Sequence, residues 1–167
     1  MDHQHDTDCK CKSTVAVQSL DEMDFERGIW SAALYNDLKK LDKYIAEGHT
    51  NNFDTTGYTA IHYAARSGHL TVCHKLLNAG AFVNSCTRSG NVTPLQRAAL
   101  MGHEQIVQLL LEKGADVFHQ DIDGNTALHK AYEKNHKNII NLLLDSSCDS
   151  TRLEGICNKK GLKAKDL

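Results

Sequence analysis

Apolar residues along this chain recur at helical spacing in short segments that end at glycine or polar turns. Three of these segments carry a leucine-rich stripe: LTVCHKLLNAG at residues 70–80, EQIVQLLLEKG at 104–114 and KNIINLLLDSS at 137–147. Each of them follows a shorter segment that carries alanines. Apolar residues at this spacing are typical of a helix that buries one face. The pattern therefore predicts pairs of helices, in which a short first helix is followed by a second one.

The helix pairs repeat at a nearly fixed period. GYTAIHYAARSGH returns as NVTPLQRAALMGH and again as GNTALHKAYEKNH, so Thr59, Thr93 and Thr126 lie 34 and then 33 residues apart. A period of about 33 residues with this signature is the ankyrin pattern. From about residue 26 to residue 140 the sequence resembles the ankyrin-repeat family. The resemblance implies an all-α solenoid of about four helix-turn-helix repeats joined by hairpin loops, at residues 26–54, 55–87, 88–120 and 121–145.

The repeated residues have clear roles at the ends of helices. Each repeated threonine stands where a first helix should begin, and its hydroxyl can accept a hydrogen bond from a free backbone N–H. Pro94 follows Thr93 at the first helical position, where proline is tolerated. Gly68 and Gly102 are predicted to turn the chain between the two helices. Gly80 and Gly114 are predicted to end the second helix in a left-handed conformation.

The two ends of the chain are less regular. Residues 1–18 are expected to be a disordered polar tail, and the capping box Ser19–Glu22 predicts a short helix. Residues 26–54 match a first repeat whose signature has worn away, which is typical of a capping repeat. Residues 146–167 are expected to be an irregular C-terminal cap or the start of a partial fifth repeat, with 146–160 an irregular connection.

Composition narrows the classes of function. The chain has 19 basic and 21 acidic residues, so it lacks the basic excess of a nucleic-acid-binding protein. No run of 18 apolar residues is present, so we expect no membrane partner. The N-terminus lacks the apolar segment of a secretory signal, and the six cysteines are therefore interpreted as thiols. We expect an intracellular monomer, in the cytoplasm, with the nucleus as an alternative.

The histidines offer candidate chemistry, but they follow the repeat. His62 and His129 share one repeat position, which Gln96 fills in the middle copy, and a second position holds His69, His103 and His136. The resemblance implies that these side chains bond to backbone groups of neighbouring loops. No nucleophile motif, phosphate loop or HExxH pattern is present. We therefore expect no enzyme activity, no catalytic residue and no cofactor.

The N-terminal tail gives one alternative. His3, His5, Cys9 and Cys11 are four possible metal ligands within nine residues. Zinc sites usually use wider pairs than these, with two to five residues between the ligands. The tail is therefore interpreted as polar chain with no metal site, and a metal-responsive module stays the alternative.

The resemblance implies one concave face, formed by the hairpin tips and the exposed positions of the first helices. Several of these positions are apolar where polar residues are expected, and they either tuck into grooves between repeats or form a strip for a protein partner. The third repeat is the most unusual, because Leu100 and Met101 replace polar residues and its GNVT loop has one extra residue. The candidate protein-binding residues are Leu34, Tyr35, Tyr58, Arg66, Arg88, Asn91, Leu100, Met101, Ile122 and Glu133.

These observations predict a non-catalytic protein-protein interaction module, an adaptor or scaffold that binds one or more unidentified proteins through its hairpin tips and concave face. Two alternatives stay open. The chain could be a substrate-recruiting or regulatory subunit of a larger enzyme complex such as a ubiquitin ligase, or the metal-responsive module described above.

Overall fold

A computed structural model describes residues 25–167 as a stack of helices, with no named strand among them. Four helix pairs follow one another along the chain, and they confirm the predicted all-α fold. A short helix and a single 3-10 turn follow the last pair. The elements are α2 (Ile29–Leu34), α3 (Leu38–Ala46), α4 (Ala60–Ser67), α5 (Leu70–Asn78), α6 (Pro94–Met101), α7 (Glu104–Glu112), α8 (Ala127–Glu133), α9 (Lys137–Ser146), α10 (Ser150–Gly155) and η1 (Ala164–Asp166).

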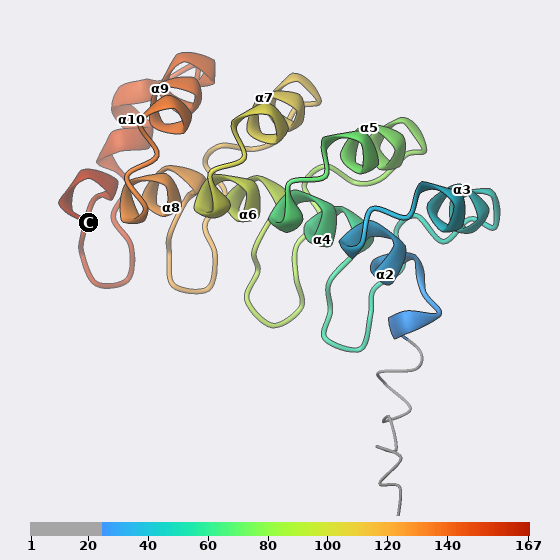
Figure 1. Cartoon of the computed structure of the whole chain (residues 1–167). Helices are drawn as coiled ribbons and strands as arrows, with labels where there is room; N and C mark the ends of the chain where they lie inside the picture. The colour runs from blue at the N-terminus through green and yellow to red at the C-terminus, as the bar shows by residue number, and fades with distance from the viewer. Residues whose placement is uncertain (1–24) are drawn as a thin grey trace, which may run out of the picture.

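The helices form two rows, and the hairpin loops project from the same side of one row (Figure 1). The first helices of the pairs, α2, α4, α6 and α8, pack side by side, and η1 continues their row. The second helices, α3, α5, α7 and α9, form the other row. One fully buried leucine from each second helix lies in the core, namely Leu41, Leu76, Leu110 and Leu143.

Small residues allow the first helices to lie close together. Ala64, Ala98 and Ala131 occupy the same position of successive first helices, and none of them is exposed. A larger side chain at such a position would overpack the stack, at a cost of about 1–3 kcal/mol. The alanine pattern of the sequence is therefore a packing requirement.

The predicted caps are confirmed. Thr59, Thr93 and Thr126 are the N-caps of α4, α6 and α8, and each takes part in a capping box with the residue three positions later. Gly80 and Gly114 follow the second helices with φ of 83°, in the left-handed region. The turns after α2 and α8 have asparagine at the position of Gly68 and Gly102. Asn36 and Asn135 adopt a positive φ there, as the two glycines do.

The C-terminal segment corrects one expectation. Residues 146–160 contain the helix α10, so they are not a wholly irregular connection as we expected. Leu153 of this helix is fully buried against the stack, which explains why the segment folds. A hairpin then leads to η1, whose Ala164 is buried in contact with α8. The polar tail and the helix expected at Ser19–Glu22 lie outside the described residues.

Candidate protein-binding surface

The histidine of the first helix links each repeat to the next one. His62 is buried, and its Nε2 lies 2.9 Å from the carbonyl oxygen of Val92 in the following hairpin. Its Nδ1 lies 2.8 Å from the hydroxyl of Thr59. Gln96 makes the same link with its amide, donating to the carbonyl oxygen of Asn125 at 2.7 Å. Both polar ends of each side chain are therefore occupied by neighbouring protein groups.

Burial keeps these histidines neutral. Loss of solvation lowers the pKa of His62 from 6.5 to about 4, and burial also lowers the pKa of His129. A histidine with so low a pKa is a poor proton shuttle near neutral pH, because it is rarely protonated. The geometry thus agrees with a structural role for this repeat position.

The second histidine position links each repeat backward. His69, His103 and His136 are the N-caps of α5, α7 and α9. Their Nε2 atoms lie 2.8, 2.9 and 3.3 Å from the carbonyl oxygens of Leu34, Arg66 and Leu100, near the end of the preceding first helix. These contacts satisfy carbonyl groups that the helix itself leaves without a partner.

Other candidate chemistry is sparse within residues 25–167. No three histidine, cysteine or acidic side chains in this part of the chain gather closely enough to hold a metal ion. Burial raises the pKa of the Cys73 thiol to about 12, which disfavours the reactive thiolate. None of the helices described is both long and apolar enough to cross a bilayer.

Each hairpin is closed by one buried polar side chain at its first residue. Oδ1 of Asp54 accepts from the backbone N–H of Tyr58 at 2.8 Å, and Oδ1 of Asp121 accepts from that of Asn125 at 2.8 Å. Asn158 does the same in the last hairpin, with Leu162 as donor at 3.1 Å. The third repeat differs, because Thr87 holds this position.

The extra residue of the third hairpin is Asn91. It adopts a positive φ of 51°, and its side-chain amide donates to the carbonyl oxygen of Gln120 at 3.0 Å. Its own carbonyl oxygen lies 2.8 Å from Nε2 of His119. The inserted residue therefore fastens its hairpin to the next loop, and its amide N–H is already engaged.

The predicted surface residues fall into three groups. The apolar ones that stand out from the surface are Tyr35, Met101 and Ile122, with 65%, 48% and 54% of their area exposed. Leu34, Tyr58 and Leu100 are half-buried, so part of the expected apolar strip packs into the stack. The remaining predicted residues, Arg66, Arg88, Asn91 and Glu133, are exposed.

Tyr58 belongs to a cluster that the sequence reasoning missed. Its ring packs against Tyr63 with 5.6 Å between centroids, and the Arg97 guanidinium lies 5.2 Å from its centroid. Arg97 also donates to the Tyr58 hydroxyl. Tyr63 and Arg97 occupy the same repeat position, directly after that of His62 and Gln96. This equivalence in the sequence could have indicated the cluster.

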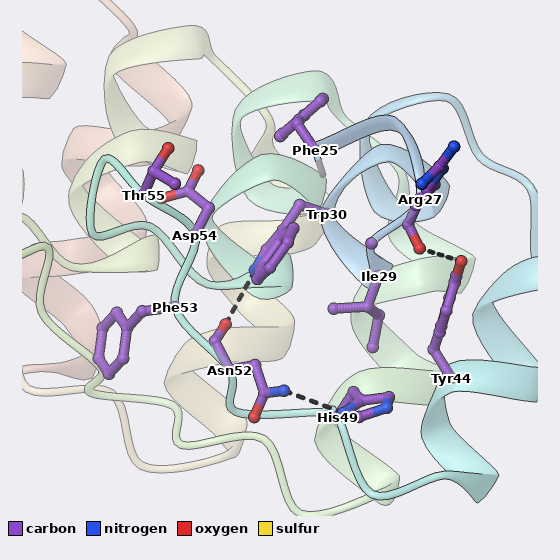
Figure 2. Close-up of a pocket in the computed structure, with 11 residues that line it drawn as sticks. Phe25, Arg27, Ile29, Trp30, Tyr44, His49, Asn52, Phe53, Asp54 and Thr55 are labelled. Carbon is purple, nitrogen blue, oxygen red and sulfur yellow. Dashed lines mark hydrogen bonds between the residues drawn. The ribbon is translucent and has the colours of Figure 1, made fainter. Parts of the chain in front are cut away.

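A pocket of about 360 Å³ lies at the first repeat, and it too was missed (Figure 2). Its walls include the rings of Phe25, Trp30, Tyr44 and Phe53. Trp30 holds the His62 position of the worn first repeat, and its Nε1 donates to the carbonyl oxygen of Asn52 at 2.9 Å (Figure 2). The pocket walls are thus tied by the same kind of link that joins the later repeats.

Comparison with known sequences agrees with this architecture. The family model described as "Ankyrin repeats (3 copies)" matches residues 29–121 and 85–154, which together cover most of the chain. The chain belongs to the ankyrin-repeat family. Ankyrin repeats are interaction modules, and the match supports a protein-binding role in general terms.

Similar proteins refine the assignment. Ankyrin repeat domain-containing protein 39 of Homo sapiens is 54% identical over 65 residues, which are 38% of this chain and 36% of that protein. Its namesake from Bos taurus is 57% identical over 54 residues, 31% of this chain and 29% of that protein. The matches thus span about a third of the length of these relatives. A probable E3 ubiquitin-protein ligase, XBOS33 of Oryza sativa subsp. japonica, is 38% identical over 100 residues, 59% of this chain and 19% of that protein.

Within this ankyrin-repeat chain the third repeat is the exceptional one. It has Thr87 where its two neighbours have aspartate, an inserted Asn91 in its hairpin, and Leu100 with Met101 at the end of its first helix. The neighbouring repeats have Arg66–Ser67 and Glu133–Lys134 at the latter place. The repeat architecture is therefore maintained without these features, which makes them candidates for contact with a partner.

Proposed function

We propose that this chain is a non-catalytic adaptor that binds a protein partner through its hairpin tips and concave face, with Leu100 and Met101 as the apolar centre. The observation that carries the proposal is Met101, a large apolar side chain with 48% of its area exposed on α6. Its equivalents in the flanking repeats, Ser67 and Lys134, are polar. Exposed apolar side chains that cluster on one surface are typical of protein interfaces.

The surrounding residues support the same face. Ile122 lies at the tip of the next hairpin, and its backbone N–H donates to the carbonyl oxygen of Gly90 at 2.9 Å. This bond joins the tips of the third and fourth hairpins, so that Ile122 is held beside the third repeat. Tyr35 adds a third exposed apolar side chain at the end of α2. A polar rim comes from Arg66, Arg88 and Glu133, which are all exposed.

A role in ubiquitin transfer is the second candidate. It is supported by the relative named as a probable E3 ubiquitin-protein ligase. The region that matches this chain is 19% of the length of that protein. On this proposal the chain recruits a substrate to a ligase, and the same face binds that substrate. We keep as predictions that the chain is an intracellular monomer, that it binds no nucleic acid, and that its tail holds no metal.

The test compares partners captured by the wild type with those captured by a double variant, Leu100→Arg with Met101→Ser, which imitates Arg66–Ser67. Burying a leucine-sized side chain contributes about 1.5–3 kcal/mol, so the loss of both should weaken binding by well over tenfold. Phe82→Ser is the matched control, because Phe82 is 67% exposed but follows α5, outside the proposed face.

We expect both variants to melt near the wild-type temperature and only the double variant to lose the partners. The same partners recovered by a normally folded double variant would place the site elsewhere. Early melting of the double variant would assign Leu100 to the core of the stack. In that case Met101→Ser alone, at a position half exposed to solvent, tests the same surface.

A further inference from the structure

One position of the first helices holds a polar side chain that bonds to an aspartate of the preceding hairpin. In the second repeat Tyr63 donates its hydroxyl proton to Oδ2 of Asp54 at 2.5 Å. In the fourth repeat Nζ of Lys130 forms an ion pair with Oδ2 of Asp121 at 2.9 Å. In both repeats the other oxygen of the aspartate closes the hairpin. One carboxylate thus serves both the hairpin and the helix beside it.

The third repeat has the cation and lacks the carboxylate. Arg97 holds the position of Tyr63 and Lys130, but the hairpin residue is Thr87, whose hydroxyl accepts from the backbone N–H of Val92 at 3.0 Å. No carboxylate of residues 25–167 lies within 4.0 Å of the Arg97 guanidinium. Among the described repeats, the third is the one that leaves this charge without a counter-ion.

The guanidinium is also incompletely bonded. Arg97 donates from one terminal nitrogen to the Tyr58 hydroxyl, while its Nε is buried and has no hydrogen-bond partner. It is the one such side-chain atom in the described part of the chain. A buried donor without a partner costs free energy, and more so on a charged group. A guanidinium held over an aromatic ring is oriented in advance for a planar carboxylate.

Arg97 lies beside the apolar centre of the proposed face. It precedes Leu100 and Met101 by three and four residues on α6, so the three side chains share one side of that helix. Arg66 and Arg88, in the second and third repeats, add two exposed positive charges. On the hairpins and first helices, the exposed acidic groups Glu133 and Asp123 come from the fourth repeat. The exposed charges on the hairpins and first helices of the second and third repeats are therefore positive, while the exposed Glu104 of the third repeat lies at the start of α7.

We propose that Arg97 receives a carboxylate of the protein partner, and that the partner segment carries an aspartate or glutamate close to a large apolar side chain. The apolar side chain packs on Leu100 and Met101, and the carboxylate pairs with Arg97 as the Oδ2 atoms of Asp54 and Asp121 pair with Tyr63 and Lys130. This inference rests on the proposed function, since it names the chemistry of the partner at the same face. Charge-assisted hydrogen bonds to a guanidinium are about twice as strong as neutral ones.

The neighbouring repeats suggest the variants for the test. Thr87→Asp restores the missing carboxylate within the protein, and it should compete with the carboxylate of a partner. Thr87→Asn is the matched control, because Asn158 already closes the last hairpin with the same shape and no charge. Both changes keep an oxygen in place to accept from Val92. Arg97→Gln removes the positive charge that the carboxylate of a partner would contact.

The probe is a phage-displayed library of random 12-residue peptides, selected against the full-length chain. We expect the selected peptides to combine an acidic residue with a nearby leucine, isoleucine, methionine or phenylalanine. A selected peptide, made synthetically and labelled with fluorescein, should bind Thr87→Asp and Arg97→Gln at least about tenfold more weakly than the wild type, which is about 1.4 kcal/mol. It should bind Thr87→Asn within about twofold of the wild type.

A double-mutant cycle assigns the contact. Replacing the acidic residue of the peptide by its amide should weaken binding to the wild type but have little effect on binding to Thr87→Asp or Arg97→Gln. An equal loss with wild type and variants would overturn the inference, as would selected peptides without an acidic residue.

The same selection separates failure of the inference from failure of the proposed function. If peptides without acidic residues are selected and the Leu100→Arg, Met101→Ser variant abolishes their binding, the proposed face stands and the role of Arg97 is wrong. If the selected peptides bind that double variant as well as the wild type, the proposed face itself is wrong.

Discussion

Nε2 of His62 lies 2.9 Å from the carbonyl oxygen of Val92, a residue 30 positions later and in the next hairpin. Since Nδ1 of the same ring faces the hydroxyl and the N–H of Thr59, Nε2 is the nitrogen that carries the proton and donates. One neutral imidazole thus caps its own helix and joins two repeats. Gln96 makes both links in the following copy without an ionisable group.

The first prediction concerns acid stability. The pKa of His62 is about 4 in the folded chain against 6.5 when exposed. Between these values the unfolded chain binds a proton that the folded chain does not, so the free energy of unfolding falls as the pH drops from 6.5 to 4. His62→Gln should remove up to about 3 kcal/mol of this loss, while at pH 7.5 its stability stays within about 1 kcal/mol of the wild type.

Urea unfolding of both proteins at pH 7.5 and pH 4.5 measures the difference. His62→Leu is the control, because it removes both hydrogen bonds and should be clearly less stable at either pH. Parallel losses of stability in the wild type and His62→Gln on acidification would show that this histidine is not the titrating group.

The repeats, their helices and their caps could be predicted from the sequence because the same residues recur in register. The link made by the first repeat could not, since Trp30 fills the histidine position with an unrelated side chain and its bond to Asn52 appears only in the structure. Arg97 was missed for a different reason. Its lack of a counter-ion depends on Thr87, ten residues earlier, and becomes visible only when the hairpin packs against the helix.

The second prediction concerns the hairpin carboxylate. Asp121→Ala should lower the free energy of unfolding by about 2–3 kcal/mol, because two backbone N–H groups and the half-buried Lys130 lose their acceptor. Asp121→Asn should cost clearly less, since Asn158 already accepts from two backbone N–H groups in the last hairpin. Chemical denaturation of the two variants measures this, and equal losses would show that charge, not shape, decides the hairpin.

The third prediction concerns the end of the stack. Ala164 is 1% exposed in contact with α8, so Ala164→Arg should overpack the contact and lower the free energy of unfolding by about 1–3 kcal/mol. The neighbouring Lys165 is exposed, and Lys165→Ala serves as the control with little expected change. Thermal melts of both variants provide the measurement. Unchanged melting of Ala164→Arg would mean that η1 does not pack on α8 in solution.

The central claim is that a protein partner docks on the third repeat, and site-specific photo-cross-linking tests it most directly. A photoreactive amino acid is placed at residue 101 or, in a matched protein, at residue 82, since Met101 and Phe82 are both exposed apolar side chains. After irradiation in cells, we predict covalent adducts with a defined partner from residue 101 and none of that partner from residue 82. Adducts of the same partner from residue 82 alone, or equally from both positions, would contradict the account.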